Sequence, residues 1–417
     1  MEPIDLLPRE GKEVDRRFGR IHASQVTGLL IVPIHMIISH WTAIPIKAMP
    51  RLVFVTILVA CLPLTSNSEL FGQPSRHLYK ITKKDNRVGF IDRTGKIVID
   101  FDRLPAEAWV GNFSEGFAPI CFADKPPSIY SSHCGFIDET GRIAIPPRFV
   151  LSSQFSEGLA WVRTETLVGF IDQSGKVVIE LPDSFSIGFQ EGLAAVTTRT
   201  GSGFIDKTGR FISTKRYEQV ENFSDGLAAV AEGRWNEAKY GFINKSGEVA
   251  IPLRFDPRLG PFEGSMSLSR FTEGLAPVMF GNLYGYIDHK GNTVIPANFR
   301  DAGQFSEGLA SVTKADGQKG YIDKTGLFVI KLASGRGGQF NEGLATLAVE
   351  INGPTKMGYI DRTGKTIIEP KFDVAFDFID GIAEVYFTKK VTSAAGPVTQ
   401  TVHAYIDKGG RFVWRSQ

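Results

Sequence analysis

The chain has 417 residues, of which 42% are apolar and 22% charged, with 47 Lys and Arg against 45 Asp and Glu. This composition is typical of a globular protein and excludes a disordered chain. The near-neutral charge lacks the basic surface that nucleic-acid binding requires, and three cysteines exclude zinc-finger, iron–sulfur and disulfide-dense folds. The 44 Gly and 31 Phe predict many short strands joined by tight turns.

Two apolar runs come first in the chain, at residues 28–39 and 52–64. Each is shorter than the roughly 20 residues that a membrane-spanning helix needs. The second run follows Arg51 and contains Leu58-Val-Ala-Cys61, a layout that is typical of a secretory signal and resembles a bacterial lipobox. We therefore expect export, with cleavage before Cys61 and lipidation of this residue. An ordinary cleaved signal and an uncleaved anchor over residues 28–64 are the alternatives.

This interpretation divides the chain into an N-terminal extension and export signal (residues 1–61), a linker (62–77) and a folded part (78–417). Cys121 and Cys134 flank a polar segment that has the character of a long hairpin loop. In an oxidising compartment they could form a disulfide, which for a loop of this length would contribute about 3 kcal/mol. Two free thiols are the alternative.

A four-residue motif, Gly-[Phe/Tyr]-Ile-[Asp/Asn], recurs through the folded part, and we call it the tetrad. It starts at Gly89, Gly135, Gly169, Gly203, Gly241, Gly285, Gly320 and Gly358, with a degenerate copy at Ala404. Each copy is followed by a turn such as Asp172-Gln-Ser-Gly-Lys176 and by a short run of β-branched residues. Asp at the first position of a type I turn caps backbone N–H groups, and Gly at the fourth takes a left-handed conformation. The motif and the run after it are therefore predicted to form a hairpin.

A second motif lies between the first ones and reads Phe-[Ser/Thr/Asn/Gln]-[Glu/Asp]-Gly-Leu-Ala-x-Val, as in the segment from Phe155 to Val162. Its Glu-Gly pair predicts a turn, and Leu-Ala-x-Val predicts a third strand that pairs with the next tetrad. One such unit buries too little to fold alone, so the units must pack against one another.

Together the two motifs closely resemble the WG repeat family, also called the KWG repeat, over about residues 78–415. The residue before the tetrad is not Trp in this chain; it is Val88 in the first copy and Cys134 in the second. The resemblance implies a repeat array of the kind found mainly in bacterial exported or surface-linked proteins. It implies no enzymatic activity, and the ligands of the family are generally unknown.

For the fold we predict an all-β tandem array of about nine three-stranded units. An open β-solenoid or superhelix is favoured, because neither end of the array shows a strand that would complete the unit at the other end. A closed propeller-like ring is the alternative.

The repeated carboxylates are the most conspicuous candidates for a site. The Asp row of the tetrads could be a ladder of Ca²⁺ sites, and the Glu row of the second motif could supply acid and base partners. A residue repeated in every unit is more simply structural, so we expect turn caps, no catalytic residue, no metal and no cofactor. His77, His133, His289 and His403 have no partner at a ligand or triad spacing.

Binding is expected where the units differ, in the insertions 122–133, 232–239, 256–270 and 388–402, with Tyr130 and Trp235 as exposed anchors. The predicted function is a non-enzymatic binding or scaffolding protein of the bacterial cell envelope. Its partner would be a protein or an envelope polysaccharide, not nucleic acid, and it would meet the membrane only through its N-terminal anchor or lipid. A polysaccharide-active enzyme with a carboxylate pair in a cavity and a purely structural spacer are the alternatives.

Overall fold

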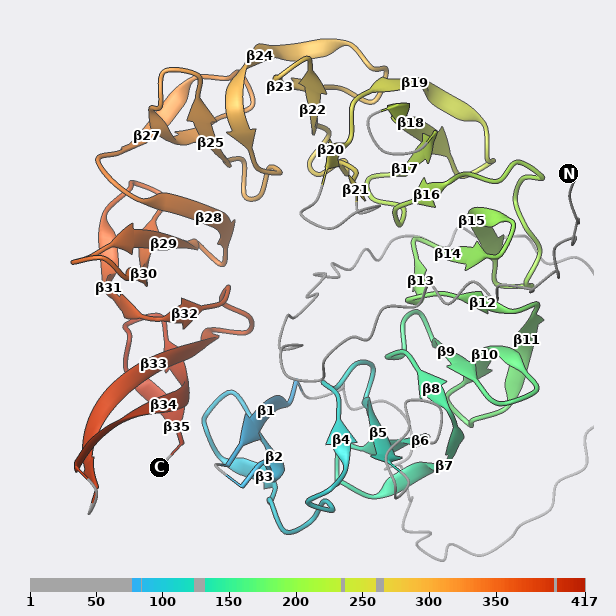
Figure 1. Cartoon of the computed structure of the whole chain (residues 1–417), viewed down its shortest axis with the longest axis vertical. Coiled ribbons are helices and arrows are strands. Elements are labelled where there is room, and N and C mark those ends of the chain that lie inside the picture. Colours follow the sequence, from blue (N-terminus) through green and yellow to red (C-terminus); the bar gives the residue numbers. More distant parts are fainter. Residues whose placement is uncertain are drawn as a thin grey trace, which may run out of the picture. The chain divides into compact units, whose positions relative to one another are not determined.

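A computed structural model describes residues 77–83, 85–123, 132–233, 237–259, 266–393 and 396–416, all of which belong to the unit Glu69–Gln417. Consecutive antiparallel sheets follow one another around a ring, in the arrangement of a β-propeller (Figure 1). We call the strands around one copy of the tetrad a blade. The tetrads lie on β2, β6, β10, β15, β18, β23, β26, β30 and β34.

The strands of the first half of the ring are β1 (Tyr79–Thr82), β2 (Val88–Ile91) and β3 (Ile97–Ile99); β4 (Trp109–Val110), β5 (Phe117–Ala123), β6 (Ser132–Asp138) and β7 (Ile143–Phe149); β8 (Leu151–Ser152), β9 (Leu159–Arg163), β10 (Val168–Asp172) and β11 (Val177–Leu181); β12 (Ser184–Phe185), β13 (Phe189–Gln190), β14 (Leu193–Thr198) and β15 (Gly201–Asp206); and β16 (Gln219–Val220), β17 (Leu227–Glu232), β18 (Lys239–Asn244) and β19 (Val249–Phe255). Each group forms one sheet.

In the second half, β20 (Arg258–Leu259) and β21 (Met266–Ser267) pair with each other; β22 (Ala276–Phe280), β23 (Leu283–Ile287), β24 (Thr293–Ala302), β25 (Ala310–Lys314), β26 (Lys319–Ile322) and β27 (Phe328–Leu332) form one sheet; β28 (Arg336–Asn341), β29 (Leu344–Glu350), β30 (Thr355–Asp361) and β31 (Thr366–Phe372) form the next; and β32 (Val374–Ala375), β33 (Ile382–Ser393), β34 (Gly396–Asp407) and β35 (Phe412–Arg415) form the last. The six-stranded sheet spans two blades, because β24 pairs with β23 on one side and β25 on the other.

The predicted hairpins are confirmed, and the turn between β10 and β11 illustrates their chemistry. The Asp172 carboxylate accepts bonds from the Ser174 and Lys176 N–H groups (2.9 and 3.1 Å) and from the Ser174 hydroxyl (2.6 Å). Gly175 follows with φ 83°, and the register shifts by one residue between Phe170 and Ile171, as a bulge requires. In the copy at Asn244 the amide oxygen accepts the same two backbone bonds, at 3.0 Å each.

The expectation of three strands per unit is wrong for most blades, which have a fourth, innermost strand. The segment before the Phe of the second motif, predicted to be a connection, pairs with the Leu-Ala-x-Val strand: Leu151 lies opposite Arg163, and Val374 opposite Tyr386. These strands are only two residues long in most blades, too short to carry a period-two pattern. In the described residues the sheet of β1 to β3 has three strands.

The hydrophobic core lies between neighbouring blades rather than within them. One cluster joins Phe170 and Ile179 of the β10 blade to Phe189 and Val196 of the β15 blade, all at most 3% exposed. The Phe170 and Phe189 rings meet edge to face with centroids 4.9 Å apart, a geometry that adds to the burial of their area. Each blade therefore depends on the next for its stability.

A belt of carboxylates runs from blade to blade through the Glu-Gly turns. Glu157 has φ 53° and Gly158 φ 84°, which makes a type I′ turn. The Glu157 carboxylate accepts a bond from the Gly192 N–H of the next turn (3.1 Å) and lies 3.1 Å from Lys207 Nζ. Equivalent bonds join the turns at Glu115, Glu191, Asp225, Glu273, Glu307 and Glu342 to Gly158, Gly226, Gly274, Gly308, Gly343 and Gly381.

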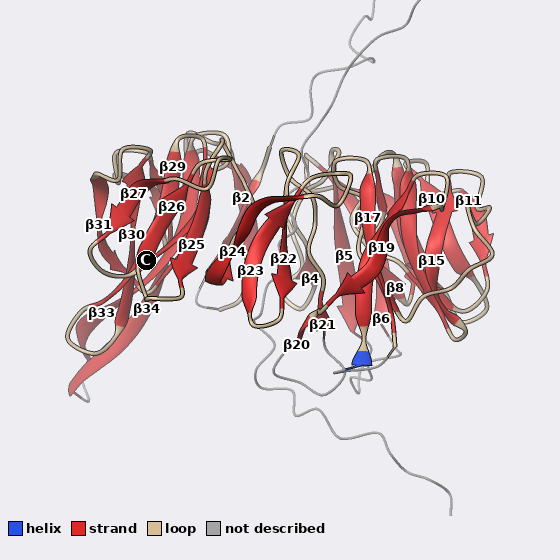
Figure 2. Cartoon of the chain, turned by 90° about the horizontal axis from the view of Figure 1, so that it is seen from above, coloured by secondary structure: helices blue, strands red, loops and turns tan. Residues whose placement is uncertain are grey.

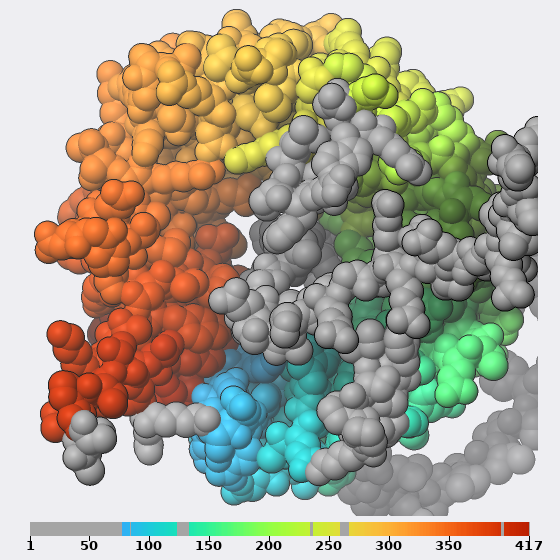
Figure 3. Space-filling view, viewed as in Figure 1, coloured from blue at the N-terminus to red at the C-terminus, as the bar shows by residue number. Residues whose placement is uncertain are grey.

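The ring closes where the last blade meets the first (Figure 3). In successive blades, the tetrad hydroxyls of Tyr286, Tyr321 and Tyr359 donate to a carbonyl of the next blade. Tyr405 of the last blade does the same to the carbonyl of Lys80 in β1 (2.9 Å), and Tyr79 donates to the carbonyl of Ile379 (2.9 Å). The expected open solenoid is therefore wrong and the closed ring is correct. The last and first blades are joined by side-chain hydrogen bonds and a shared apolar cluster. A ring closed in this way needs no strand shared between the two ends, so the lack of such a strand does not indicate an open array.

We expect the turn carboxylates to make stability fall in acid. The Ser174 hydroxyl and the turn N–H groups hold the pKa of Asp172 below its ordinary value, so its contribution is complete above about pH 4 and is lost as the pH falls through the lower folded value. The melting temperature of Asp172→Asn, measured against pH, should differ most from that of the parent protein near pH 7 and converge with it below pH 4. Asn244→Asp adds a carboxylate to its turn, so its melting temperature should lie above that of the parent protein near pH 7 and converge with it below pH 4. A difference that does not depend on pH would contradict this role.

Removing one member of the carboxylate belt should destabilise the ring. Glu157→Ala leaves the Gly192 N–H without its charged acceptor and should lower the free energy of unfolding by about 1.5–3 kcal/mol, measured by urea denaturation. Glu165→Ala, at an exposed position of the neighbouring hairpin, is the matched control and should change it little. Equal stability of the two variants would show that the belt does not hold the blades together.

Candidate functional site

The two faces of the ring are built from different connections. Strands alternate in direction, so the Glu-Gly turns and the Asp turns lie on one face and the remaining connections on the other (Figure 2). We call these the tight-turn face and the insertion face. The described ends of all four predicted insertions belong to the insertion face, and the longest described insertion is not a loop but an extension of β33 and β34. The tight-turn face is nearly the same in every blade, so differences between blades gather on the insertion face.

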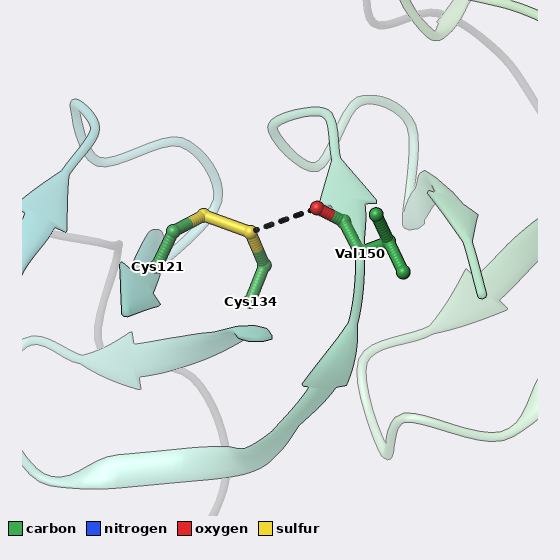
Figure 4. The surroundings of a disulfide bond; sticks show 3 residues. All are labelled: Cys121, Cys134 and Val150. Carbon is green, nitrogen blue, oxygen red and sulfur yellow. Dashed lines mark hydrogen bonds between the residues drawn. A yellow bond between two sulfur atoms is a disulfide. The ribbon is translucent and has the colours of Figure 1, made fainter. Parts of the chain in front are cut away.

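The predicted site residues fall partly outside the described residues. Cys61, Tyr130 and Trp235 all do, and lipidation and the two aromatic anchors stay predictions. Cys121 of β5 and Cys134 of β6 lie directly opposite each other, with Cα atoms 4.0 Å apart and the two sulfurs bonded (Figure 4). Cys134 is 1% exposed, and its Sγ lies 3.7 Å from the carbonyl oxygen of Val150. The pair ties together the base of the insertion 122–133.

Exposed apolar side chains gather on the innermost strands of three consecutive blades. Trp109 of β4 is 58% exposed, Leu151 of β8 44% and Phe185 of β12 54%. The register places the three at equivalent positions, opposite Cys121, Arg163 and Thr197, next to the connections of the insertion face. Ile187, two residues beyond Phe185, is 52% exposed. We call these four residues the inner rim. Because these side chains expose apolar area at neighbouring positions of the ring, the inner rim is the candidate contact surface.

Charged groups border the inner rim. Arg163, opposite Leu151, contacts the Asp183 carboxylate at 2.6 Å, and Arg199 contacts its other oxygen at 2.7 Å. The Arg199 guanidinium, which has the larger effect, and the Arg163 guanidinium hold the pKa of Asp183 below its ordinary value. At the other end, Lys80 lies 5.9 Å from the centre of the Trp109 ring and donates to the carbonyl of Val110. The rim therefore combines apolar faces with planar donors and acceptors.

A buried indole lies behind the rim. Trp161 is 2% exposed, and its ring stacks edge to face on Phe185 with centroids 5.3 Å apart. Its Nε1 has no hydrogen-bond partner among the described residues. Trp161 occupies the variable position of the second motif, where neighbouring blades have Pro119 and Ala195. The buried indole therefore packs against one of the exposed residues of the rim.

Two of the equivalent positions on the other side of the ring are charged. Asp301 and Arg336 occupy the register of Leu151 and Phe185 and form an ion pair, and Arg258 contacts the same carboxylate at 3.6 Å. At the same position the remaining blades have Gln219, Ser267 and Val374, of which Val374 is 41% exposed. The largest exposed side chains at this position, Trp109 and Phe185, therefore lie in one arc of the ring.

A second departure from the repeat lies where the ring closes. Glu384 occupies the variable position of the second motif and His403 the position before the tetrad. His403 Nε2 lies 2.8 Å from Glu384 Oε1, and the ring stacks on Tyr386 at 4.7 Å between centroids. Burial raises the pKa of Tyr386, whose hydroxyl donates to Glu384 at 2.7 Å. Both partners of this carboxylate are provided by its own blade.

In the described residues no group of three or more His, Cys, Asp or Glu side chains is arranged to hold a metal ion. The described residues also contain no helix with the length and apolar character needed to cross a membrane.

Sequence reasoning missed the inner rim. Trp109, Leu151 and Phe185 lie in the segment that the sequence predicts to be a connection, where no strand pattern marks the three as equivalent. The signal that could have found them is positional, since each stands four residues before the Phe of the second motif: Phe113, Phe155 and Phe189.

No curated protein matches the sequence. Solved structures to which this chain shows similarity include a crystal structure of the eukaryotic initiation factor, 13% identical, for which the match covers 83% of this chain and 89% of that one with a TM-score of 0.41. KlHsv2 with loop 6CD replaced by a Gly-Ser linker is 10% identical and covers 64% of this chain and 99% of that one, with a TM-score of 0.37. An acylaminoacyl peptidase from Pyrococcus horikoshii is 11% identical and covers 74% and 52%, with a TM-score of 0.37.

The family model described as "WG containing repeat" matches residues 89–125, 135–165, 169–198, 203–233, 240–284, 284–317 and 357–390. These segments make up more than half of the chain, and they begin at or next to the tetrads. The protein therefore belongs to the WG repeat family.

Proposed function

We propose that the protein is a non-enzymatic binding or scaffolding module of the bacterial cell envelope, and that the inner rim is its contact surface for an envelope polysaccharide. The observation that carries this proposal is the exposure of Trp109, Phe185 and Ile187, each more than half exposed, on one arc of an otherwise repetitive ring. An exposed indole costs free energy in water unless a partner covers it, because its apolar area stays hydrated.

The chemistry around the rim favours a glycan over an apolar peptide. The apolar faces of sugar rings stack on aromatic side chains, while sugar hydroxyls both donate and accept hydrogen bonds. Arg163 and Arg199 supply donors in a fixed fork, and Asp183 supplies acceptors beside Phe185. A purely apolar peptide side chain would leave these three charged groups unused.

The absence of enzymatic activity is part of the proposal. A polysaccharide-active enzyme needs two carboxylates placed on either side of the scissile bond. The carboxylates of the Asp and Glu rows described above are engaged in turn caps and in the belt between blades. Glu384, which breaks the repeat, faces His403 and Tyr386 rather than a second carboxylate.

Export is supported by the disulfide. Such bonds persist in oxidising compartments, and Cys121 and Cys134 lie opposite each other in one hairpin at bonding distance. This is consistent with a signal that is cleaved before Cys61, since lipidation of that residue would leave the other two cysteines as the only pair.

The rim can be tested by co-sedimentation with purified peptidoglycan sacculi. We expect the parent protein to sediment with them and the double variant Trp109→Ala, Phe185→Ala to lose at least tenfold in affinity, because stacking surface is removed. Leu327→Ala removes a 67% exposed side chain outside the rim and is the matched control. Equal retention of the double variant would refute the rim as the contact surface. Capture of envelope proteins without sedimentation would replace the glycan by a protein partner.

Export can be tested by intact mass measurement of the protein isolated from its own cells. The proposal expects a chain that begins at Cys61 and carries lipid, and a mass gain of two hydrogens on reduction. Reduction should also lower stability by about 3 kcal/mol, as loop closure predicts. An unprocessed N-terminus together with two free thiols would refute export.

A further inference from the structure

Strands β33 and β34 form a ribbon that extends beyond their blade. Their pairing is continuous, from Ile382 opposite Asp407 to Ser393 opposite Gly396. The neighbouring strand β32 pairs with β33 only where Val374 lies opposite Tyr386 and Ala375 opposite Val385. In the side view the ribbon projects from the insertion face (Figure 2). From Lys389 onward, β33 has β34 as its one strand partner among the described residues.

The outer edge of β33 offers backbone groups to a further strand. The carbonyls of Glu384 and Tyr386 accept bonds from Phe376 and Asp373 on the side of β32, so the even-numbered residues of β33 present their backbone groups to this edge. The next N–H in line, that of Thr388, is capped by the Asp373 carboxylate at 2.6 Å. The N–H and C=O groups of Lys390 and Thr392 therefore continue the same edge past the end of β32. Edges of this kind pair readily with extended chains.

The charge of the ribbon selects the partner. Residues 388–402 contain Lys389 and Lys390 and no acidic residue. The acid next to this edge, Asp373, already forms an ion pair with Lys356. A second copy of the ribbon would bring lysine against lysine, which disfavours pairing between identical chains. A lipid surface could attract the lysines, but it would leave the backbone groups of Lys390 and Thr392 without partners.

We propose that the free edge of β33 is a docking site for an extended, acidic peptide segment of a protein partner, which adds to the ribbon as a third strand. Backbone bonds at Lys390 and Thr392 provide the pairing, and Lys389 and Lys390 provide selectivity for carboxylates. This site is separate from the inner rim, so the failure of either proposal leaves the other standing.

The test is fluorescence anisotropy with a labelled peptide that alternates valine with glutamate, added to the full mature chain. Two comparison peptides have lysine in place of glutamate, or proline at the centre of the acidic sequence. We expect the acidic peptide to bind at least tenfold more tightly than either comparison peptide. The lysine peptide is repelled by Lys389 and Lys390, and the proline peptide lacks a backbone donor and cannot pair along its whole length.

Variants separate the two contributions. Lys389→Glu, Lys390→Glu should reduce acidic-peptide affinity at least tenfold, and Thr392→Pro, which removes an N–H from the proposed edge, at least fivefold. Thr399→Pro, on the opposite edge of the ribbon, should keep the parent affinity, and circular dichroism should show that all variants are folded. Unchanged binding by Thr392→Pro, or equal binding of the proline peptide, would overturn the proposal. So would binding to anionic phosphatidylglycerol vesicles without binding to the acidic peptide.

Discussion

The whole ring depends on one constraint: a blade of four short strands cannot bury its own apolar face. Phe170 finds its partner in Phe189 of the next blade, and Glu157 finds its hydrogen-bond donor in the next turn. Both contacts run in the same direction along the chain. Stability is therefore a sum of interfaces between neighbours, as in other repeat proteins, with the seam between the last and first blades as the one interface that joins distant residues.

The local structure could be predicted because each hairpin carries its turn chemistry in consecutive residues. Asp172, Ser174 and Gly175 are sufficient to define a capped turn with a bulge, and the same residue types recur in most of the other copies. The fourth strand could not be predicted in this way. Leu151 and Ser152 pair with β9 through backbone bonds alone, and two residues carry no alternation of buried and exposed side chains.

Closure and the candidate site escaped prediction for a different reason. At the seam the Tyr405 hydroxyl donates to a carbonyl of the first blade, just as the Tyr359 hydroxyl donates to a carbonyl of the blade that follows it. Nothing in the sequence around Tyr405 therefore distinguishes a ring from an open array. The inner rim depends on which copies lie next to one another on the ring and on how exposed Trp109 and Phe185 remain. Exposure at a given position is a property of the assembled ring, and the repeat pattern gives no information about it.

The carboxylate belt has a direction, since each acidic side chain reaches forward to the following turn. Inserting one more copy between two blades would recreate the same forward contact on both of its sides. The array can therefore gain or lose whole modules during gene duplication without the need for new interface chemistry, and only the curvature demanded by the seam limits how many modules one ring accepts.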